Sequence, residues 1–173
     1  FNDEMSEFDL TRILTGSEGT LAFITEARLD ITRLPKVRRL VNVKYDSFDS
    51  ALRNAPFMVQ AKALSVETVD SKVLNLARED IVWHSVSELI TDVPDKEMLG
   101  LNIVEFAGDD ATLIDQQVTT LCQRLDELMA GSEAGVIGWQ VCHDLDGVER
   151  IYAMRKKAVG LLGNAKGAAK PIP

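Results

Sequence analysis

Residues 37–70 read VRRLVNVKYDSFDSALRNAPFMVQAKALSVETVD, and this stretch decides the fold. Its first nine residues, VRRLVNVKY at 37–45, alternate in hydrophobicity with the period of two that indicates a β-strand. Ser47 is a favoured N-cap residue, and apolar residues then recur at helical spacing through 47–62. The segment ALSVETVD at 63–70 returns to a strand pattern. The stretch therefore predicts a β-α-β unit.

A second unit of the same kind follows further along the chain. The segment MLGLNIVEFAG at 98–108 has the pattern of a strand. Residues 109–130 form the clearest helix, because their apolar side chains make one stripe and Gly131 follows as a stop signal. The segment VIGWQVCHD at 136–144 is predicted to be a fourth strand, and 147–163 a last helix.

A short helical pattern at 70–80, with Asp70 or Ser71 as its predicted N-cap, and an irregular segment at 81–96 lie between the two units. We interpret the irregular segment as an insertion over the core. Two β-α-β units predict an α+β fold with a ferredoxin-like open sheet and helices on one face. A doubly wound parallel sheet is the alternative. The first is favoured because VNVKY and NIVEF keep polar residues at alternate positions, whereas strands buried on both faces are more uniformly apolar.

The composition limits the classes of partner. With 27 acidic and 19 basic residues, the net charge is -8. Such a surface argues against nucleic acid, whose binding depends on Lys and Arg neutralising phosphates. No stretch is long and apolar enough for a transmembrane segment. Cys122 and Cys142 fit neither a metal site nor a disulfide framework, so we interpret both as buried free thiols. The expected localisation is cytoplasmic, with peripheral association with the inner membrane as an alternative.

Other polar residues give weaker signals. His84 and His143 have no cysteine or carboxylate at ligand spacing, so neither predicts a metal site. The segment DLDG at 144–147 resembles the start of an EF-hand loop, but its twelfth position is an arginine rather than glutamate. Glu67 and Glu105 are strand carboxylates that would face a site, although a solvated sheet face is the default interpretation for both.

The segment LTGSEGTLAFIT at 14–25 raises the question of a phosphate site. Gly16 and Gly19 would let backbone N–H groups approach an anion, and Ser17 and Thr20 add hydroxyl donors. The segment is neither a P-loop nor a GxGxxG fingerprint. On this chemistry alone, a turn before the strand-like LAFITEARLDI is as well supported as a phosphate cradle.

The longer stretch DLTRILTGSEGTLAFITEARLDITRLP at 9–35 resembles the end of the FAD-binding domain in FAD-linked oxidases and dehydrogenases acting on D-2-hydroxy acids. This family includes glycolate oxidase, D-lactate dehydrogenase and D-2-hydroxyglutarate dehydrogenase. Its TGSEGTLG stretch lines the pyrophosphate and ribityl region of the flavin. Ala22 stands where the family usually has glycine, and its methyl group would restrict backbone approach. The resemblance implies these cofactor-binding residues: Thr15, Gly16, Ser17, Glu18, Gly19, Thr20, Ile24 and Thr25.

The segment MRKKAVGLLGNAKGAAKPIP at 154–173 is similar to relatives acting on D-2-hydroxyglutarate. In these, an active-site arginine is followed fifteen residues later by a lysine. The resemblance implies that Arg155 and Lys170 bind the substrate carboxylate, a role that suits a guanidinium fork and an ammonium group. Val159 replaces a threonine of those relatives, which removes one hydroxyl contact. The residues alone leave an alternative, in which RKK at 155–157 complements the dipole near a helix C-terminus.

The resemblance also implies the domain organisation. Residues 1–35 would be the incomplete C-terminal tail of an FAD-binding domain, and 36–173 the FAD-linked oxidase C-terminal (substrate or cap) domain, truncated at its C-terminus. We expect a fragment of a bacterial FAD and iron-sulfur member, whose iron-sulfur cluster and divalent metal lie outside these residues. The rest of the FAD-binding domain is then the expected partner.

The implied activity is oxidation of a small D-2-hydroxy acid by hydride transfer to FAD. D-2-hydroxyglutarate is preferred and D-lactate comes next, because a second carboxylate would explain a second cation. The segment alone is expected to be inactive and not to retain FAD, and its catalytic residues and electron acceptor stay unassigned. The alternative is a non-catalytic ferredoxin-like regulatory or small-ligand-binding module. An ordered strand pair with its own core at residues 1–35 would favour that alternative.

Overall fold

The computed structural model describes residues 6–131 and 134–164, and the chain divides into two units, Phe1–Leu34 and Pro35–Pro173. The described part of the first unit contains one helical turn, α1 (Thr11–Leu14). Between residues 6 and 34 there is no strand, and no side chain is buried. The strand pair with its own core, which would have favoured the module interpretation, is therefore not found in this part of the chain.

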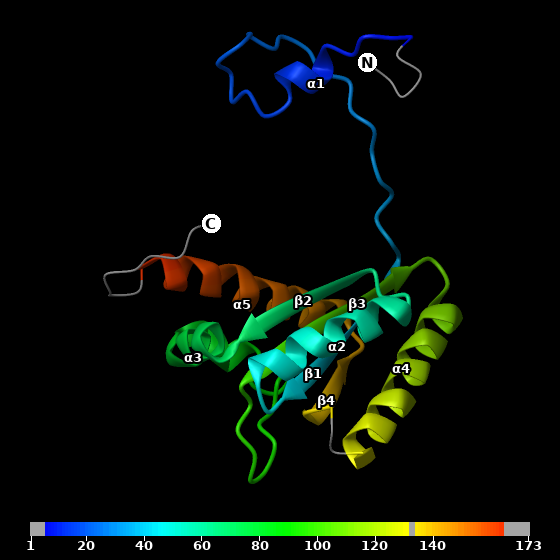
Figure 1. Ribbon diagram of the computed structural model, residues 1–173, viewed down its shortest axis with the longest axis vertical. Coiled ribbons are helices and arrows are strands. Elements are labelled where there is room, and N and C mark those ends of the chain that lie inside the picture. The colour runs from blue at the N-terminus through cyan, green and yellow to red at the C-terminus, as the bar shows by residue number, and fades with distance from the viewer. Residues whose placement is uncertain (1–5, 132–133, 165–173) are drawn as a thin grey trace. The chain divides into compact units, whose positions relative to one another are not determined.

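The second unit contains the predicted alternation of strands and helices (Figure 1). Ser47 Oγ accepts a hydrogen bond from the Ser50 N–H (3.1 Å), and Asp70 Oδ1 accepts one from the Val73 N–H (2.8 Å). These two side chains cap helices as the sequence predicts. The elements are β1 (Val37–Tyr45), α2 (Phe48–Gln60), β2 (Ser65–Asp70), α3 (Ser71–Glu79), the 3-10 helix η1 (Ile81–Ser85), β3 (Gly100–Gly108), α4 (Ala111–Gly131), β4 (Val136–Cys142) and α5 (Leu145–Asn164).

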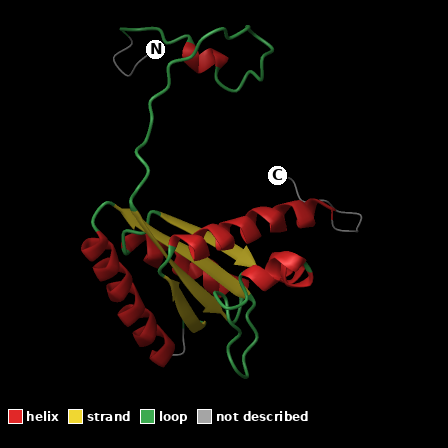
Figure 2. Cartoon of the chain, turned by 180° about the vertical axis from the view of Figure 1, so that it is seen from behind, coloured by secondary structure: helices red, strands yellow, loops and turns green. Residues whose placement is uncertain are grey.

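The four strands form one open sheet in the order β2-β3-β1-β4, and all neighbouring strands are antiparallel (Figure 2). In each β-α-β unit, the two strands are therefore separated by a strand of the other unit. This interleaving is the split β-α-β arrangement of ferredoxin-like folds. The α+β prediction is confirmed, and the doubly wound parallel sheet is wrong for this chain.

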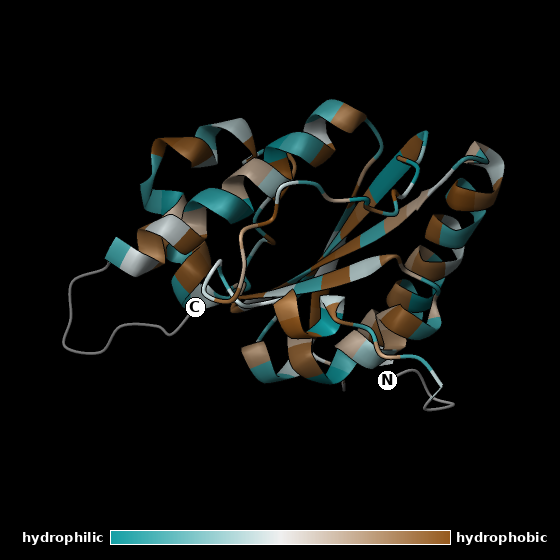
Figure 3. Cartoon of the chain, turned by 90° about the horizontal axis from the view of Figure 1, so that it is seen from above, coloured by the Kyte–Doolittle hydropathy of each residue, from teal (hydrophilic) through white to brown (hydrophobic). Residues whose placement is uncertain are grey.

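Helices cover both faces of the sheet, which corrects the expectation of helices on one face (Figure 3). The crossover helices α2 and α4 pack on one face, where Met58 and Leu121 join Val41 and Phe106 of the strands. Helices α3 and α5 pack on the other face. There, the core cluster consists mainly of Leu40, Leu74, Leu101, Ile103, Ile151 and Met154. The second layer exists because α5 has its own apolar stripe, which must be removed from water.

The polar strand residues that suggested a solvated face are in fact buried. Asn42 and Asn102 are fully buried, and Lys44 and Glu105 are 3% and 6% exposed. Asn102 Nδ2 donates to the Tyr45 hydroxyl (3.1 Å) and to the Ala51 carbonyl (3.0 Å). Buried polar groups are tolerated when they are hydrogen-bonded in this way. The alternation of polar and apolar residues was thus a signal of buried hydrogen bonds rather than of solvent.

The segment between η1 and β3 lies on the α5 face of the sheet and is held there by some of these polar groups. Asn42 Nδ2 donates to the Leu89 carbonyl (3.1 Å), and Lys44 Nζ donates to Thr91 Oγ1 (3.1 Å). Burial lowers the pKa of Lys44 below its usual value. Val86, Ile90 and Met98 of the same segment are buried in the core. The insertion expected at 81–96 is therefore part of the packed domain.

Gly100, at the start of β3, allows α2 to approach the sheet closely. A Cβ atom at this position would lie 2.7 Å from the Ser47 carbonyl oxygen and 3.0 Å from the Ala51 Cβ. We expect Gly100→Ala to lower the free energy of unfolding by about 1–3 kcal/mol, because backbone must move to admit the methyl group. Chemical denaturation of the chain measures this loss. The control is Gly160→Ala, whose added Cβ would have no heavy atom within 4 Å; equal stability of the two variants would contradict the close approach.

Candidate functional site

The predicted substrate anchor Arg155 lies in the body of α5, well before the helix ends at Asn164. The last turn of α5 contains no basic residue. The alternative in which RKK at 155–157 complements the helix dipole is therefore wrong, since that effect acts within the last turn. The side chain of Arg155 is 46% exposed. It is a partly exposed cation in mid-helix, and its position needs another explanation.

Arg155 connects α5 to the edge strand β2, because its Nε forms an ion pair with Glu67 Oε2. The two atoms are close enough to form an ion pair, but Glu67 Oε2 does not accept an aligned hydrogen bond. The Glu67 side chain is 28% exposed, so it is partly covered rather than on a fully solvated face. The sequence marked both residues separately but gave no sign that they meet, because they lie on elements far apart in the chain.

A pocket of about 270 Å³ opens beside Arg155, where β2 ends. Within the described residues, the lining of this pocket has one cation, Arg155, among mainly apolar walls. Asp70 also borders the pocket, but its Oδ1 caps α3. A guanidinium beside apolar walls suits a carboxylate attached to a short carbon chain. The lining residues are Phe48, Thr68, Val69, Asp70, Val73, Arg155 and Val159.

A second carboxylate, Glu105, holds α5 to the sheet at the position of Tyr152. Glu105 Oε1 accepts from Arg38 Nε (2.6 Å), and Glu105 Oε2 accepts from the Tyr152 hydroxyl (2.6 Å) and from Ser65 Oγ (3.3 Å). The Arg38 guanidinium also lies over the Tyr152 ring, 5.3 Å from its centroid. The default of a solvated Glu105 is wrong, because α5 covers this part of the sheet.

The titration of this network follows from its geometry. Burial alone would raise the pKa of Glu105, but hydrogen bonds from Arg38 and Tyr152 more than offset burial, so its pKa lies below the usual value of 4.5. Burial, together with the hydrogen bond to Glu105, raises the pKa of Tyr152 to about 12. Glu105 is therefore a charged acceptor and Tyr152 a neutral donor at neutral pH. Since Tyr152 precedes Arg155 by one helical turn, this network fixes the part of α5 that contains Arg155.

The predicted flavin loop forms a turn directly after α1. Gly16, Glu18 and Gly19 have positive φ angles of 84°, 49° and 79°. The N–H of Ser17 donates to the Leu14 carbonyl (3.1 Å), and the N–H of Thr20 donates to the Ser17 carbonyl (2.9 Å). A Cβ at either glycine would have no heavy atom within 4 Å. The loop is therefore a turn with open backbone at its two glycines, and its binding of a flavin phosphate stays a prediction.

The other predicted cofactor-binding residues, Thr15, Ile24 and Thr25, are exposed. Thr15 Oγ1 donates to the Thr11 carbonyl (2.8 Å) at the end of α1. Ile24 is 69% exposed, and Thr25 is also exposed. Lys170 lies outside the described residues, so its pairing with Arg155 stays a prediction. Val159 is 55% exposed and borders the Arg155 pocket.

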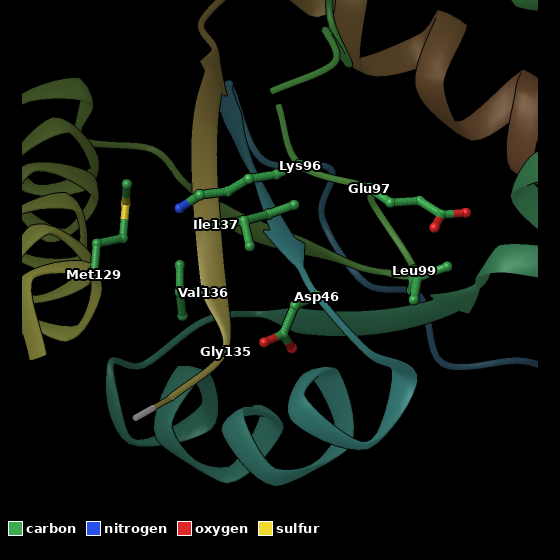
Figure 4. Close-up of a pocket in the computed structure, with 8 residues that line it drawn as sticks. All are labelled: Asp46, Lys96, Glu97, Leu99, Met129, Gly135, Val136 and Ile137. Atoms are coloured by element: carbon green, nitrogen blue, oxygen red, sulfur yellow. The ribbon is translucent and has the colours of Figure 1, made fainter. Parts of the chain in front are cut away.

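Another pocket, of about 360 Å³, lies between β4 and the residues that precede β3 (Figure 4). Figure 4 shows Lys96 extending across β4, whereas Glu97 points away from it. Asp46 Oδ1 accepts a hydrogen bond from Ser50 Oγ (2.9 Å), which holds the Asp46 side chain against the first turn of α2. None of the predicted site residues is among those that line this pocket. Its lining is Asp46, Lys96, Glu97, Leu99, Met129, Gly135, Val136 and Ile137.

Two other classes of site are absent from the described ranges 6–131 and 134–164. No group of three or more His, Cys, Asp or Glu side chains is arranged to hold a metal ion there. None of the helices in these ranges is long and apolar enough to cross a membrane. Cys122 and Cys142 are free and buried, as the sequence predicts.

Comparison with known proteins identifies the family. Over residues 34–173, the chain matches the family described as FAD linked oxidases, C-terminal domain. It is 90% identical over its whole length to a D-2-hydroxyglutarate dehydrogenase of Escherichia coli, and 43% identical over 99% of its length to one of Pseudomonas putida. The chain spans 17% of the length of each of these relatives. A glycolate oxidase subunit of Bacillus subtilis is 30% identical over 41% of this chain and 16% of its own length. The resemblance noted in the sequence is thus confirmed, and the chain belongs to the family of FAD-linked oxidases.

Proposed function

We propose that the chain is part of an FAD-dependent dehydrogenase that oxidises a D-2-hydroxy acid, with D-2-hydroxyglutarate as the preferred substrate and D-lactate next. The observation that carries this proposal is the 90% identity, over the whole chain, to a protein named D-2-hydroxyglutarate dehydrogenase. The pocket geometry supports it, because Arg155 offers a guanidinium beside apolar walls. The second unit would then be the substrate or cap domain, from residue 36 onward.

In this proposal, Arg155 and Lys170 bind substrate carboxylates. A guanidinium can hold a carboxylate through two parallel hydrogen bonds, which orients the acid as well as retaining it. An ammonium at Lys170 would add a second, compact positive charge. Two cations suit a dicarboxylate better than a monocarboxylate, which is why D-2-hydroxyglutarate precedes D-lactate.

The loop at 15–20, with Ile24 and Thr25, is proposed to bind the flavin. FAD, when bound, supplies the acceptor for the hydride that leaves the substrate carbon. The loop's part is to present backbone N–H groups to the pyrophosphate, which its open glycines allow. Residues 1–35 would be the tail of the FAD-binding domain and need the rest of that domain to retain the cofactor.

Two further parts of the proposal concern the setting of the protein. The buried free thiols of Cys122 and Cys142 suit a reducing compartment such as the cytoplasm. Peripheral association with the inner membrane is the alternative setting. An iron-sulfur cluster and a divalent metal are proposed to lie in parts of the protein outside this chain.

The test is reduction of the bound flavin in the full-length protein that contains this chain. Under anaerobic conditions, D-2-hydroxyglutarate, D-lactate and glycolate are added in turn, and the flavin absorbance is followed. We expect D-2-hydroxyglutarate to bleach the flavin fastest, with L-2-hydroxyglutarate as the control that leaves it oxidised. A flavin that no D-2-hydroxy acid reduces would refute the proposed function.

A further inference from the structure

We propose that Glu67 is a positioning residue for Arg155, which holds the Nε side of the guanidinium so that its Nη groups stay available to the substrate carboxylate. The proposal rests on the proposed function, because it assumes that Arg155 binds substrate. It assigns a role to a residue that does not itself line the pocket. The structural basis is the ion pair between β2 and α5 beside the pocket.

The way in which the two residues meet leaves the arginine free to bind. Glu67 contacts Nε, and an arginine has further N–H donors on its two Nη atoms. Within residues 6–131 and 134–164, Arg155 has no other ion-pair or hydrogen-bond partner. A carboxylate contacting the Nη groups end-on would not have to displace Glu67. The geometry therefore permits both contacts at once.

The comparison with Glu105 shows that Glu67 is not one more structural anchor. Glu105 is 6% exposed and accepts hydrogen bonds from three side chains. Glu67 lies on the same face of the sheet, across from Ile103 in the β2–β3 register. Its side chain is 28% exposed, and Arg155 is its one partner among the described residues. Since Arg155 is 46% exposed, the pair is accessible to solvent and contributes little to stability, so the effect of Glu67 is expected on the arginine.

The energetic benefit is a smaller loss of conformational freedom on binding. A partly exposed arginine has about 2 kcal/mol of rotamer entropy, and ordering such a side chain on binding weakens affinity. Glu67 belongs to a strand whose backbone is fixed by pairing with β3. Glu67 therefore restrains the Arg155 guanidinium before the substrate binds. The resulting effect should appear in substrate affinity more than in the rate of hydride transfer.

The experiment compares three variants of the full-length protein by anaerobic flavin reduction over a range of D-2-hydroxyglutarate concentrations. Glu67→Ala should raise the half-saturating concentration about tenfold and change the limiting reduction rate little. Glu67→Gln retains an acceptor oxygen and should recover most of the affinity. Glu88→Ala is the matched control, because Glu88 pairs with another α5 arginine, Arg150, at 2.6 Å and does not line the pocket; it should behave like the wild type.

Each result decides the proposal. Unchanged affinity in Glu67→Ala overturns it, and so does an affinity loss that Glu88→Ala shares. Tighter binding in both Glu67 variants also overturns it, because Glu67 would then compete with the substrate for Arg155. A melting temperature within about 2 °C of the wild type shows that an affinity loss is not unfolding. Failure of the proposed function looks different, since the wild-type flavin itself would then not be reduced.

Discussion

Arg155→Ala in the full-length protein is expected to raise the KM for D-2-hydroxyglutarate about 100-fold, because hydrogen bonds to charged groups contribute roughly 1.5–3 kcal/mol and the variant loses a bidentate contact. The change also leaves Glu67 without its partner beside the pocket. That carboxylate would then repel an anionic substrate and add to the loss. Since the arginine is proposed to bind the acid and not to take part in hydride transfer, KM should change more than kcat.

The matched control is Lys156→Ala, which removes one positive charge from the neighbouring, exposed position of the same helix. Lys156 does not line the Arg155 pocket. Steady-state kinetics of both variants separate a specific contact from a general electrostatic effect. Kinetics of Arg155→Ala equal to those of Lys156→Ala would remove Arg155 from the substrate site.

Glu105→Ala is expected to have the largest effect on stability. The change leaves the Arg38 guanidinium and the Tyr152 hydroxyl without their shared acceptor in a covered position. Removing one partner of a buried ion pair costs about 3–5 kcal/mol, and the partial exposure of Arg38 places this case near 3 kcal/mol. Calorimetry should show a melting temperature lower by about 10 °C.

Asp115→Ala provides the comparison for this stability loss. Asp115 pairs with Arg39 on the adjacent position of β1 at 2.9 Å, but its side chain is 50% exposed. Exposed pairs contribute about 0–1 kcal/mol, so this variant should melt close to the wild type. A similar, small loss in both variants would contradict the structural role of the Glu105 network.

The same network predicts a pH dependence. The pKa of Glu105 is lower in the folded chain than its usual value of 4.5. Its charged form therefore stabilises the fold fully above about pH 4.5, and this contribution is lost as the pH falls through the lower folded value. The stability difference between the wild type and Glu105→Gln should be constant near neutral pH and shrink under acidic conditions. A stability difference between the two proteins that grows on acidification would contradict a lowered pKa of Glu105.

Local sequence patterns were sufficient for the order of elements. The alternation at 37–45 coincides with β1, and Ser47 and Asp70 cap the helices as expected. Caps and periodicity involve residues within one or two turns of each other, so a single sequence contains them. The ferredoxin-like arrangement also followed, because two β-α-β units of this length have few ways to share one sheet.

The faces of the sheet could not be predicted in the same way. Polar residues such as Asn42 and Asn102 at alternate strand positions have the same pattern whether water or a buried hydrogen bond satisfies them. Their partners, among them the Leu89 and Ala51 carbonyls, come from distant parts of the chain. The second helical layer over β1 and β3 is therefore a property of the tertiary structure.

By itself, the sequence determined the α+β fold class, the family and the separate candidates Arg155 and the 15–20 loop, because these depend on local pattern and motif. Only the tertiary structure decided that Arg155 stands in mid-helix beside a pocket and that Glu67 of the edge strand is its partner. It also enclosed Glu105 within a network that fixes α5. The physical reason is that ion pairs and burial join residues distant in the chain, and their energies depend on a geometry that no local pattern contains.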